Sequence, residues 1–229
     1  MQEEADDRCD GLVIIGKCNK DAIRKLEKRY KSIVYVNRDA ASGEVDEVIY
    51  NGSQIASTAV EYLISLGHES IGYVGACNNE ARYRGYVETL EKHGLQVEAD
   101  YVINTKQSEL EGYEAMERLI QLEHYPTGIY CANDITAIGV LKYLNKYKNR
   151  YYMFSIISSD GIEEAQYTTS MLTTVEISKT DMGKFALYLL IDRLRGGHKG
   201  VARMELQCRL LKRESCTLAE ESKWCDYYI

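Results

Sequence analysis

Asn133 and Asp134 form a polar pair directly after the apolar run "GIYCA" (residues 128–132) and directly before a helical pattern that starts with "ITAIGV". One such residue is expected at a helix start, because an Asn or Asp side chain there accepts a hydrogen bond from an unpaired backbone N–H. A cap needs only one residue. Capping therefore leaves the second polar side chain unexplained, and a place for it facing a ligand is the alternative.

Polar side chains also follow the other short apolar runs of the chain. They include amides, carboxylates, hydroxyls and one Arg that stands a helical turn further on, a set that suits a small hydroxyl-rich ligand better than a flat apolar one. Each residue alone could equally be a helix cap or a solvated side chain. The residues that follow the runs are Lys17, Cys18, Asn19, Asn37, Arg38, Asp39, Ala76, Cys77, Asn78, Asn79, Arg82, Ser158, Ser159 and Asp160, of which Ala76 is apolar.

The runs themselves are short, rich in β-branched residues and nearly continuous in apolar character, which is typical of strands buried on both faces of a parallel sheet. They are residues 12–15, 32–36, 71–75, 128–132 and 153–157. Amphipathic segments separate them, and two of these segments end at glycines suited to the left-handed position after a helix, Gly67 and Gly94. The alternation predicts an α/β fold in which the carboxyl ends of the strands gather the polar residues at one edge of a sheet.

One segment near the end has a different period. Met204, Leu206, Cys208 and Leu210 alternate with polar residues, which predicts a half-exposed strand at a sheet edge.

Composition excludes several classes of protein. The 229 residues carry a formal net charge of −7 with both signs evenly mixed, so the chain itself should not bind nucleic acid. No apolar stretch is long enough to cross a membrane, and the acidic start is not a signal peptide, which predicts a cytoplasmic protein. The seven Cys and four His lack the spacing of a metal site, so we expect reduced thiols and no metal.

Motifs for catalysis are missing as well. The sequence has no G-x-S-x-G elbow, no P-loop and no G-x-G-x-x-G after a strand. Asp134 and Asp160 could pair as acid and base, but no nucleophile or cofactor loop accompanies them. A binding protein with no catalytic residue and no cofactor is therefore expected rather than an enzyme.

Eight segments in order resemble the effector-binding core of LacI/GalR-family bacterial repressors, and together they cover Asp10 to about Ser215. The resemblance implies a two-lobed fold of the periplasmic-binding-protein type (type I), with parallel sheets flanked by helices. The matching segments are "DGLVIIG", "TAVEYLISLGHESIGYVG", "RYRGYVETLEKHGL", "GYEAMERLI", "YPTGIYCANDITAIGVLKYL", "SIISSDGIEEAQY", "LTTVEISKTDMGKFALYLLIDRL" and "LLKRES".

The resemblance also implies a ligand site in the cleft between the lobes. The family's ligand residues fall on Arg82 of an R-x-x-G signature, Asn133 with Asp134 following, Asp160, and Asn37. A small sugar or sugar derivative is the implied effector. The chain departs from the family pattern at positions that often carry a second Asp or aromatic stacking faces, namely Ser158, Ser159, Gly161, Gln107 and Lys179.

By the family's topology, an N-terminal lobe comprises residues 1–67 and 177–201, a C-terminal lobe comprises 68–176 and 202–216, and 217–229 form a C-terminal extension. The family's helix-turn-helix, its hinge and its opening strand, helix and strand precede the "DGLVII" run, which here begins almost at once. We therefore expect an incomplete N-terminal lobe that exposes apolar sheet until residues outside this sequence or a partner complete it. A homodimer that contacts DNA only through the missing headpiece is implied.

Two other functions remain open from the sequence. A periplasmic or extracellular solute-binding protein of a sugar ABC transporter shares the fold, but it needs an export signal and usually has few free thiols. A hydrolase on this fold would need catalytic residues that the sequence does not offer.

Overall fold

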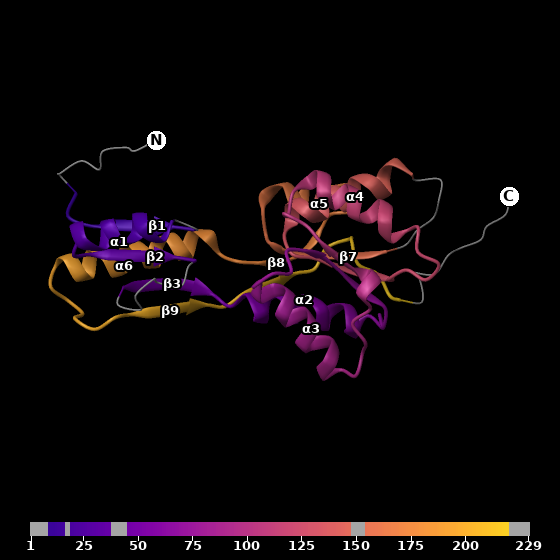
Figure 1. Ribbon diagram of the computed structural model, residues 1–229, viewed down its shortest axis with the longest axis horizontal. Helices are drawn as coiled ribbons and strands as arrows, with labels where there is room; N and C mark the ends of the chain where they lie inside the picture. The colour runs from indigo at the N-terminus through magenta and orange to yellow at the C-terminus, as the bar shows by residue number, and fades with distance from the viewer. Residues whose placement is uncertain (1–8, 17–18, 38–44, 148–153, 220–229) are drawn as a thin grey trace. The chain divides into compact units, whose positions relative to one another are not determined.

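The computed structural model describes residues 9–16, 19–37, 45–147 and 154–219, which form two compact units. The smaller unit comprises Met1–Tyr50 and Ser178–Gln207, and the larger unit comprises Asn51–Ile177 and Cys208–Ile229. Both units are α/β, as expected (Figure 1). None of the helices among the described residues has the length and apolar character needed to span a membrane.

The smaller unit is a four-stranded parallel sheet in the order β1-β2-β3-β9. Its core is built around β2, whose residues are all buried. On one face Leu12 and Ile14 of β1 pack with the buried Ile23 of α1 and Tyr35 of β2. The elements are β1 (Leu12–Ile15), α1 (Lys20–Arg29), β2 (Ile33–Val36), β3 (Asp46–Tyr50), α6 (Lys179–Leu194) and β9 (Arg203–Leu206).

The two edges of this sheet differ in chemistry. On β9 the exposed positions are the charged Arg203 and Glu205, which discourage pairing with another strand. On β1 all residues are apolar, only β2 pairs with it among the described residues, and Ile15 is 75% exposed. The predicted exposure of apolar sheet is therefore present at β1.

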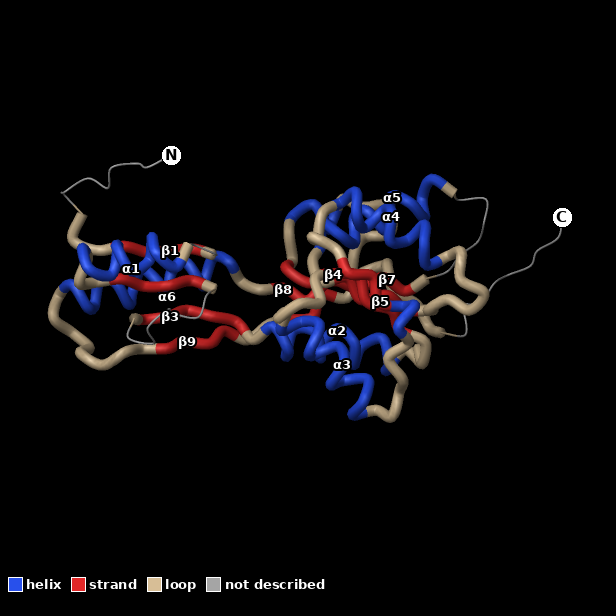
Figure 2. Tube along the Cα trace, in the orientation of Figure 1, coloured by secondary structure: helices blue, strands red, loops and turns tan. Residues whose placement is uncertain are grey.

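The larger unit contains a six-stranded sheet in the order β10-β8-β7-β6-β4-β5, in which only β10 is antiparallel. Figure 2 shows α4 and α5 over one face of this sheet and α2 and α3 over the other. The elements are α2 (Gly52–Ser65), β4 (Ile71–Gly75), α3 (Ala81–Lys92), η1 (Ala99–Tyr101), β5 (Val102–Asn104), α4 (Glu109–Leu119), β6 (Gly128–Cys131), α5 (Asp134–Lys146), β7 (Ser155–Asp160), η2 (Glu163–Gln166), β8 (Thr173–Glu176) and β10 (Arg209–Leu211).

The local signals that end helices act as predicted. Gly67 and Gly94 adopt φ values of +88° and +71°, and the amide of each donates to a carbonyl in the last turn of the preceding helix.

The boundaries between the units correct the predicted lobes at two places. α2 lies before the predicted crossing at Gly67 but packs against β6, β7 and β8, because its buried face of Ile55, Ala59 and Leu63 matches that sheet. The crossing therefore falls at Tyr50/Asn51. The crossing predicted near Val201 falls at Gln207/Cys208, because β9 pairs with β3.

The alternating segment predicted as one edge strand is two strands in two sheets. β9 is an edge of the four-stranded sheet, and β10 is an edge of the six-stranded sheet. The period-2 pattern continues through both because each strand has one covered and one solvated face, so the change of sheet leaves no mark on the hydrophobic alternation. The predicted extension comprises residues 217–229, and its residues after Ala219 lie outside the described part of the chain.

Candidate functional site

The order of the strands creates a topological switch point in the six-stranded sheet of the larger unit. From β4 the chain passes through α3 to β5 on one side, and from β5 it returns through α4 to β6 on the other side of β4. The loops that leave β4 and β6 therefore diverge. In open parallel sheets ligands bind at such a switch point, outside the carboxyl ends of the strands.

Arg82 spans this switch point. It lies in the first turn of α3, its residue is 6% exposed, and its Nη1 donates to the carbonyl of Ala132 at the end of β6 over 2.5 Å. Its Nη2 donates to Asp160 Oδ1 at 2.7 Å. The guanidinium is thereby fixed between the ends of β6 and β7.

Asp160 is the second fixed group of the site. It ends β7 with a φ of +111°, a value that a non-glycine residue rarely adopts, and Gly161 follows at +62°. Its side chain is 28% exposed and forms a charge-assisted bond with Arg82. Asn79 and Gln107, in the loops after β4 and β5, also have positive φ. Unfavourable backbone conformations of this kind concentrate at functional sites.

Asn133 is the helix cap that the sequence predicts. Its Oδ1 accepts from the amide of Thr136 at 2.9 Å, and its Nδ2 donates to the carbonyl of Gln107 at 3.3 Å. The side chain therefore ties the end of β6 to the loop after β5. It is only partly buried, next to the carbonyl that holds Arg82.

The expectation that Asp134 faces a ligand is wrong. Asp134 is fully buried, and its carboxylate accepts hydrogen bonds from Ser158 Oγ at 2.5 Å, Thr174 Oγ1 at 2.6 Å and the Ile162 amide at 2.7 Å. These partners come from β7, β8 and the loop after β7. Asp134 therefore fastens the start of α5 to the sheet beneath the site, which is a structural role.

A set of buried hydroxyl groups that the sequence did not predict supports the site. Successive residues of β7 point to opposite faces, so Ser158 meets Asp134 while Ser159 Oγ lies 2.8 Å from the hydroxyl of Tyr130. Tyr73 and Tyr130 form an edge-on ring pair, and the Tyr73 hydroxyl donates to the Ala76 carbonyl. Burial raises the pKa of both phenols, which keeps them neutral. In the sequence, the feature that could have indicated these buried hydroxyl groups is the high number of tyrosines, 19 in all.

Asn37 belongs to the smaller unit. It follows β2 with a φ of +58°, and its Nδ2 donates to the hydroxyl of Tyr50 at 2.8 Å. The structure thus brings together Arg82, Asp160 and Asn133, whereas Asn37 as a ligand residue stays a prediction. The strand-end residues Lys17, Cys18, Arg38 and Asp39 lie outside the described residues.

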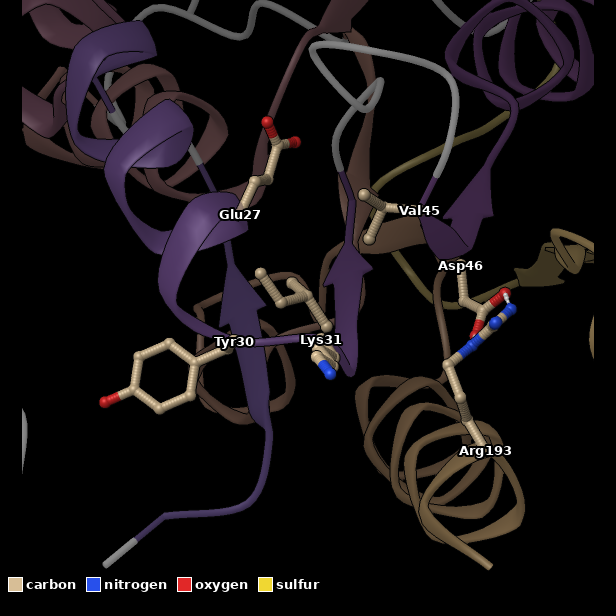
Figure 3. A pocket seen from close by; sticks show the side chains of 7 residues that line it. Glu27, Tyr30, Lys31, Val45, Asp46 and Arg193 are labelled. Atoms are coloured by element: carbon tan, nitrogen blue, oxygen red, sulfur yellow. Dashed lines mark hydrogen bonds and ion pairs between the residues drawn. The ribbon is translucent and has the colours of Figure 1, made fainter. Parts of the chain in front are cut away.

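Two pockets lie away from these residues. One, of about 220 Å³, is in the smaller unit beside Asp46 and Arg193 (Figure 3). The other, of about 490 Å³, lies at the opposite, amino edge of the six-stranded sheet, among Glu69, Asp100 and Glu123. Neither pocket is lined by Arg82, Asn133 or Asp160. We place the candidate site at the switch point because the carboxyl ends of the parallel strands bring these three residues together there.

Within the part of the chain that the structure describes, no group of three or more His, Cys, Asp or Glu is placed to hold a metal ion. The described cysteines are free thiols: Cys9, Cys77, Cys131, Cys208 and Cys216.

Comparisons with known proteins agree with this architecture. Residues 60–216 match the family described as periplasmic binding protein-like domain. The HTH-type transcriptional repressor PurR of Mannheimia succiniciproducens is 30% identical over 91% of this chain and 64% of its own length. The repressor MelR of Bacillus subtilis is 28% identical over 94% and 66%.

A LacI-family transcriptional regulator of Enterococcus faecium, solved with bound ribose, superposes with a TM-score of 0.80 at 26% identity. The match covers 91% of this chain and 80% of that one. The chain spans slightly less than two thirds of the length of the curated relatives cited above. The Enterococcus faecium regulator thus shares its fold with this chain. On the family match over residues 60–216, the chain belongs to the family of periplasmic binding protein-like domains.

Proposed function

We propose that this chain is the ligand-sensing core of a LacI/GalR-type transcriptional repressor and that it binds a small sugar-like effector. The observation that carries the proposal is the Arg82–Asp160 pair at the switch point of the larger unit. A hydroxyl group both donates and accepts, so adjacent hydroxyls of a sugar match a fixed donor beside a fixed acceptor. Asn133 adds a partly exposed amide next to this pair.

The sugar class has support from a relative as well as from chemistry. The Enterococcus faecium regulator, which shares the fold at 26% identity, was solved with ribose. Asn37 is proposed as a further ligand residue because it combines a strand-end position, a positive φ and an exposed amide.

The cellular setting of the chain is proposed from its relatives. They are named as transcriptional repressors of the helix-turn-helix type, which supports a cytoplasmic regulator that acts as a homodimer and contacts DNA through a separate headpiece. Ligand binding would then shift the population between two states of the core that present the headpieces differently. The same relatives disfavour a transporter's solute-binding protein and a catalytic role.

Calorimetric titration of the chain with a panel of monosaccharides, disaccharides and sugar phosphates tests the proposal. We expect at least one sugar to bind, and Arg82→Ala to weaken its binding by tenfold or more, about 1.4 kcal/mol. Arg84→Ala is the matched control, because Arg84 is an exposed residue of the same helix and should leave binding unchanged. No binding across the panel, or equal loss in both variants, would refute the proposal.

A further inference from the structure

Asp46 is a buried carboxylate that the proposed ligand site does not use. It begins β3 in the smaller unit and is fully buried. Arg193 of α6 approaches it with two nitrogens, Nε and Nη2, each 2.6 Å from a carboxylate oxygen, and Figure 3 shows the two side chains facing one another. The amide of Ala202 donates to the same carboxylate at 2.8 Å. Asp46 thus joins the end of α6 to the start of β3.

His198 links this carboxylate to a second one. Its Nε2 lies 2.9 Å from Asp46 Oδ2, and its Nδ1 lies 2.6 Å from Asp192 Oδ2. A neutral imidazole has one N–H and one lone pair, so only one of these contacts could then be a hydrogen bond. Both ring nitrogens face carboxylate oxygens, which accept and cannot donate when ionised. The geometry therefore fits the doubly protonated imidazolium.

The bonds around His198 hold the segment that follows α6. The amide of His198 also donates to Asp192 Oδ2, and the amide of Gly197 donates to the Asp192 carbonyl. Arg193 Nη2 donates to the Gly200 carbonyl at 2.8 Å. The carbonyl of Ala202, the residue before β9, accepts a hydrogen bond from the Glu47 amide of β3. This bond lies at the start of the pairing between β9 and β3. The position of β9 therefore depends on this segment.

Other charged groups surround the cluster. Glu27 of α1 and Lys31 line the pocket that Asp46 and Arg193 also line. On the β9 side, Arg203 pairs with Glu47 at 3.6 Å. The direct partners of His198 are Asp192 and Asp46, while Arg193 opposes its charge. These groups together determine how readily the imidazole holds its second proton.

The electrostatics of the cluster agree with the geometry. Hydrogen bonds to Asp192 and then to Asp46 raise the pKa of His198 above its ordinary value. Burial alone would raise the pKa of Asp46, but its bonds from Arg193, Ala202 and His198 outweigh burial and lower it. The carboxylate therefore stays ionised while the imidazole titrates.

We propose that His198 is a proton-controlled latch, which in its imidazolium form fastens residues 196–202 between α6 and β3 and on losing a proton releases them. This goes beyond ligand sensing at the switch point and does not depend on it. A group whose pKa is raised on folding stabilises the fold fully below its unfolded value. That stabilisation is lost as the pH rises through the folded value, so the latch opens on the alkaline side.

Long-range ¹H–¹⁵N NMR of the imidazole rings of the full chain, from pH 5 to 9, tests the protonation. The signals of His198 are assigned with the His198→Gln variant. We expect a titration midpoint above the ordinary value of about 6.5. The midpoint should fall in Asp192→Asn and stay unchanged in His124→Gln, which alters an exposed histidine of the larger unit. A midpoint at or below the ordinary value overturns the proposal.

Hydrogen exchange of the amides of residues 196–202, corrected for intrinsic exchange rates, tests the release. In the wild type we expect the protection of these amides to fall roughly threefold or more as the pH rises through the titration midpoint of His198. In His198→Gln we expect their protection to be low at every pH. Constant protection in the wild type overturns the latch. Should His198→Gln fail to fold, the same measurement on Asp192→Asn tests the latch. The proposal requires the amides of residues 196–202 in Asp192→Asn to lose their protection at a lower pH than in the wild type.

Discussion

Asn133 and Asp134 are adjacent in the sequence, yet their side chains serve different parts of the structure. Asn133 remains partly exposed at the carboxyl edge of the six-stranded sheet, where it caps α5 and holds the Gln107 carbonyl. Asp134 is fully buried and binds β7 and β8. Asn133 therefore belongs to the candidate site, whereas Asp134 belongs to the buried structure that supports the site.

We expect Asp134→Asn to destabilise the larger unit strongly. The amide cannot accept the three hydrogen bonds that the carboxylate accepts, and its NH₂ would face donors in a buried place. The free energy of unfolding should fall by about 3 kcal/mol. Asn133→Ala, which removes only a helix cap, should cost about 1 kcal/mol. Urea denaturation measures both, and equal losses would contradict the structural role of Asp134.

Gly112 determines how closely α4 and α5 pack. A Cβ on Gly112 would overlap the carbonyl of Thr136, and backbone cannot move as a flexible side chain can. We expect Gly112→Ala to lower the free energy of unfolding by about 2 kcal/mol. The control is Gly183→Ala in α6, where the added methyl meets nothing within 4 Å and should stabilise the chain by roughly 0.5–1 kcal/mol. A neutral Gly112→Ala variant would show that the helices are farther apart.

Stability should fall in mild acid because of His68. This residue is 1% exposed, and desolvation lowers its pKa despite the hydrogen bond with the Thr217 carbonyl. A histidine whose pKa is lowered on folding binds fewer protons in the folded chain. Its stabilisation is therefore present above its unfolded value, about 6.5, and is lost as the pH falls, with a slope of up to about 1.4 kcal/mol per pH unit.

The measurement is chemical denaturation from pH 5 to 8 of the wild type and His68→Gln. The variant loses the bonds to Thr127 and Ser155 and should be less stable at pH 8. The difference should narrow toward pH 5, because only the wild type has this histidine to protonate. A constant difference across the range would mean that His68 does not titrate with folding.

The β1 edge should promote self-association. Ile15 is 75% exposed on a strand without charged residues. An exposed apolar edge strand of this kind can pair with a strand of another molecule. Ile15→Lys places a charge there and should lower the weight-average mass measured by sedimentation at high concentration. Tyr167→Lys is the control, since Tyr167 is 77% exposed but lies outside any strand. The same reduction in both variants would point to net charge rather than to the edge.

The sequence by itself determined the α/β class, the main strands, the glycines that end α2 and α3, and the carboxyl-edge position of Arg82, Asn133 and Asp160. These features follow from local periodicity and from short motifs, which a chain carries whatever its tertiary partners are. The strand β3 was not predicted, because its first two residues, Asp46 and Glu47, look like surface residues. Both are buried, and the structure pairs them with Arg193 and Arg203.

Only the tertiary structure decided which sheet each segment joins and which polar neighbour turns inward. The change of sheet between β9 and β10, the place of α2 and the burial of Asp134 all depend on partners far away in the sequence. A carboxylate is stable in the interior only where several donors meet it, and those donors come from strands whose order the local pattern does not specify.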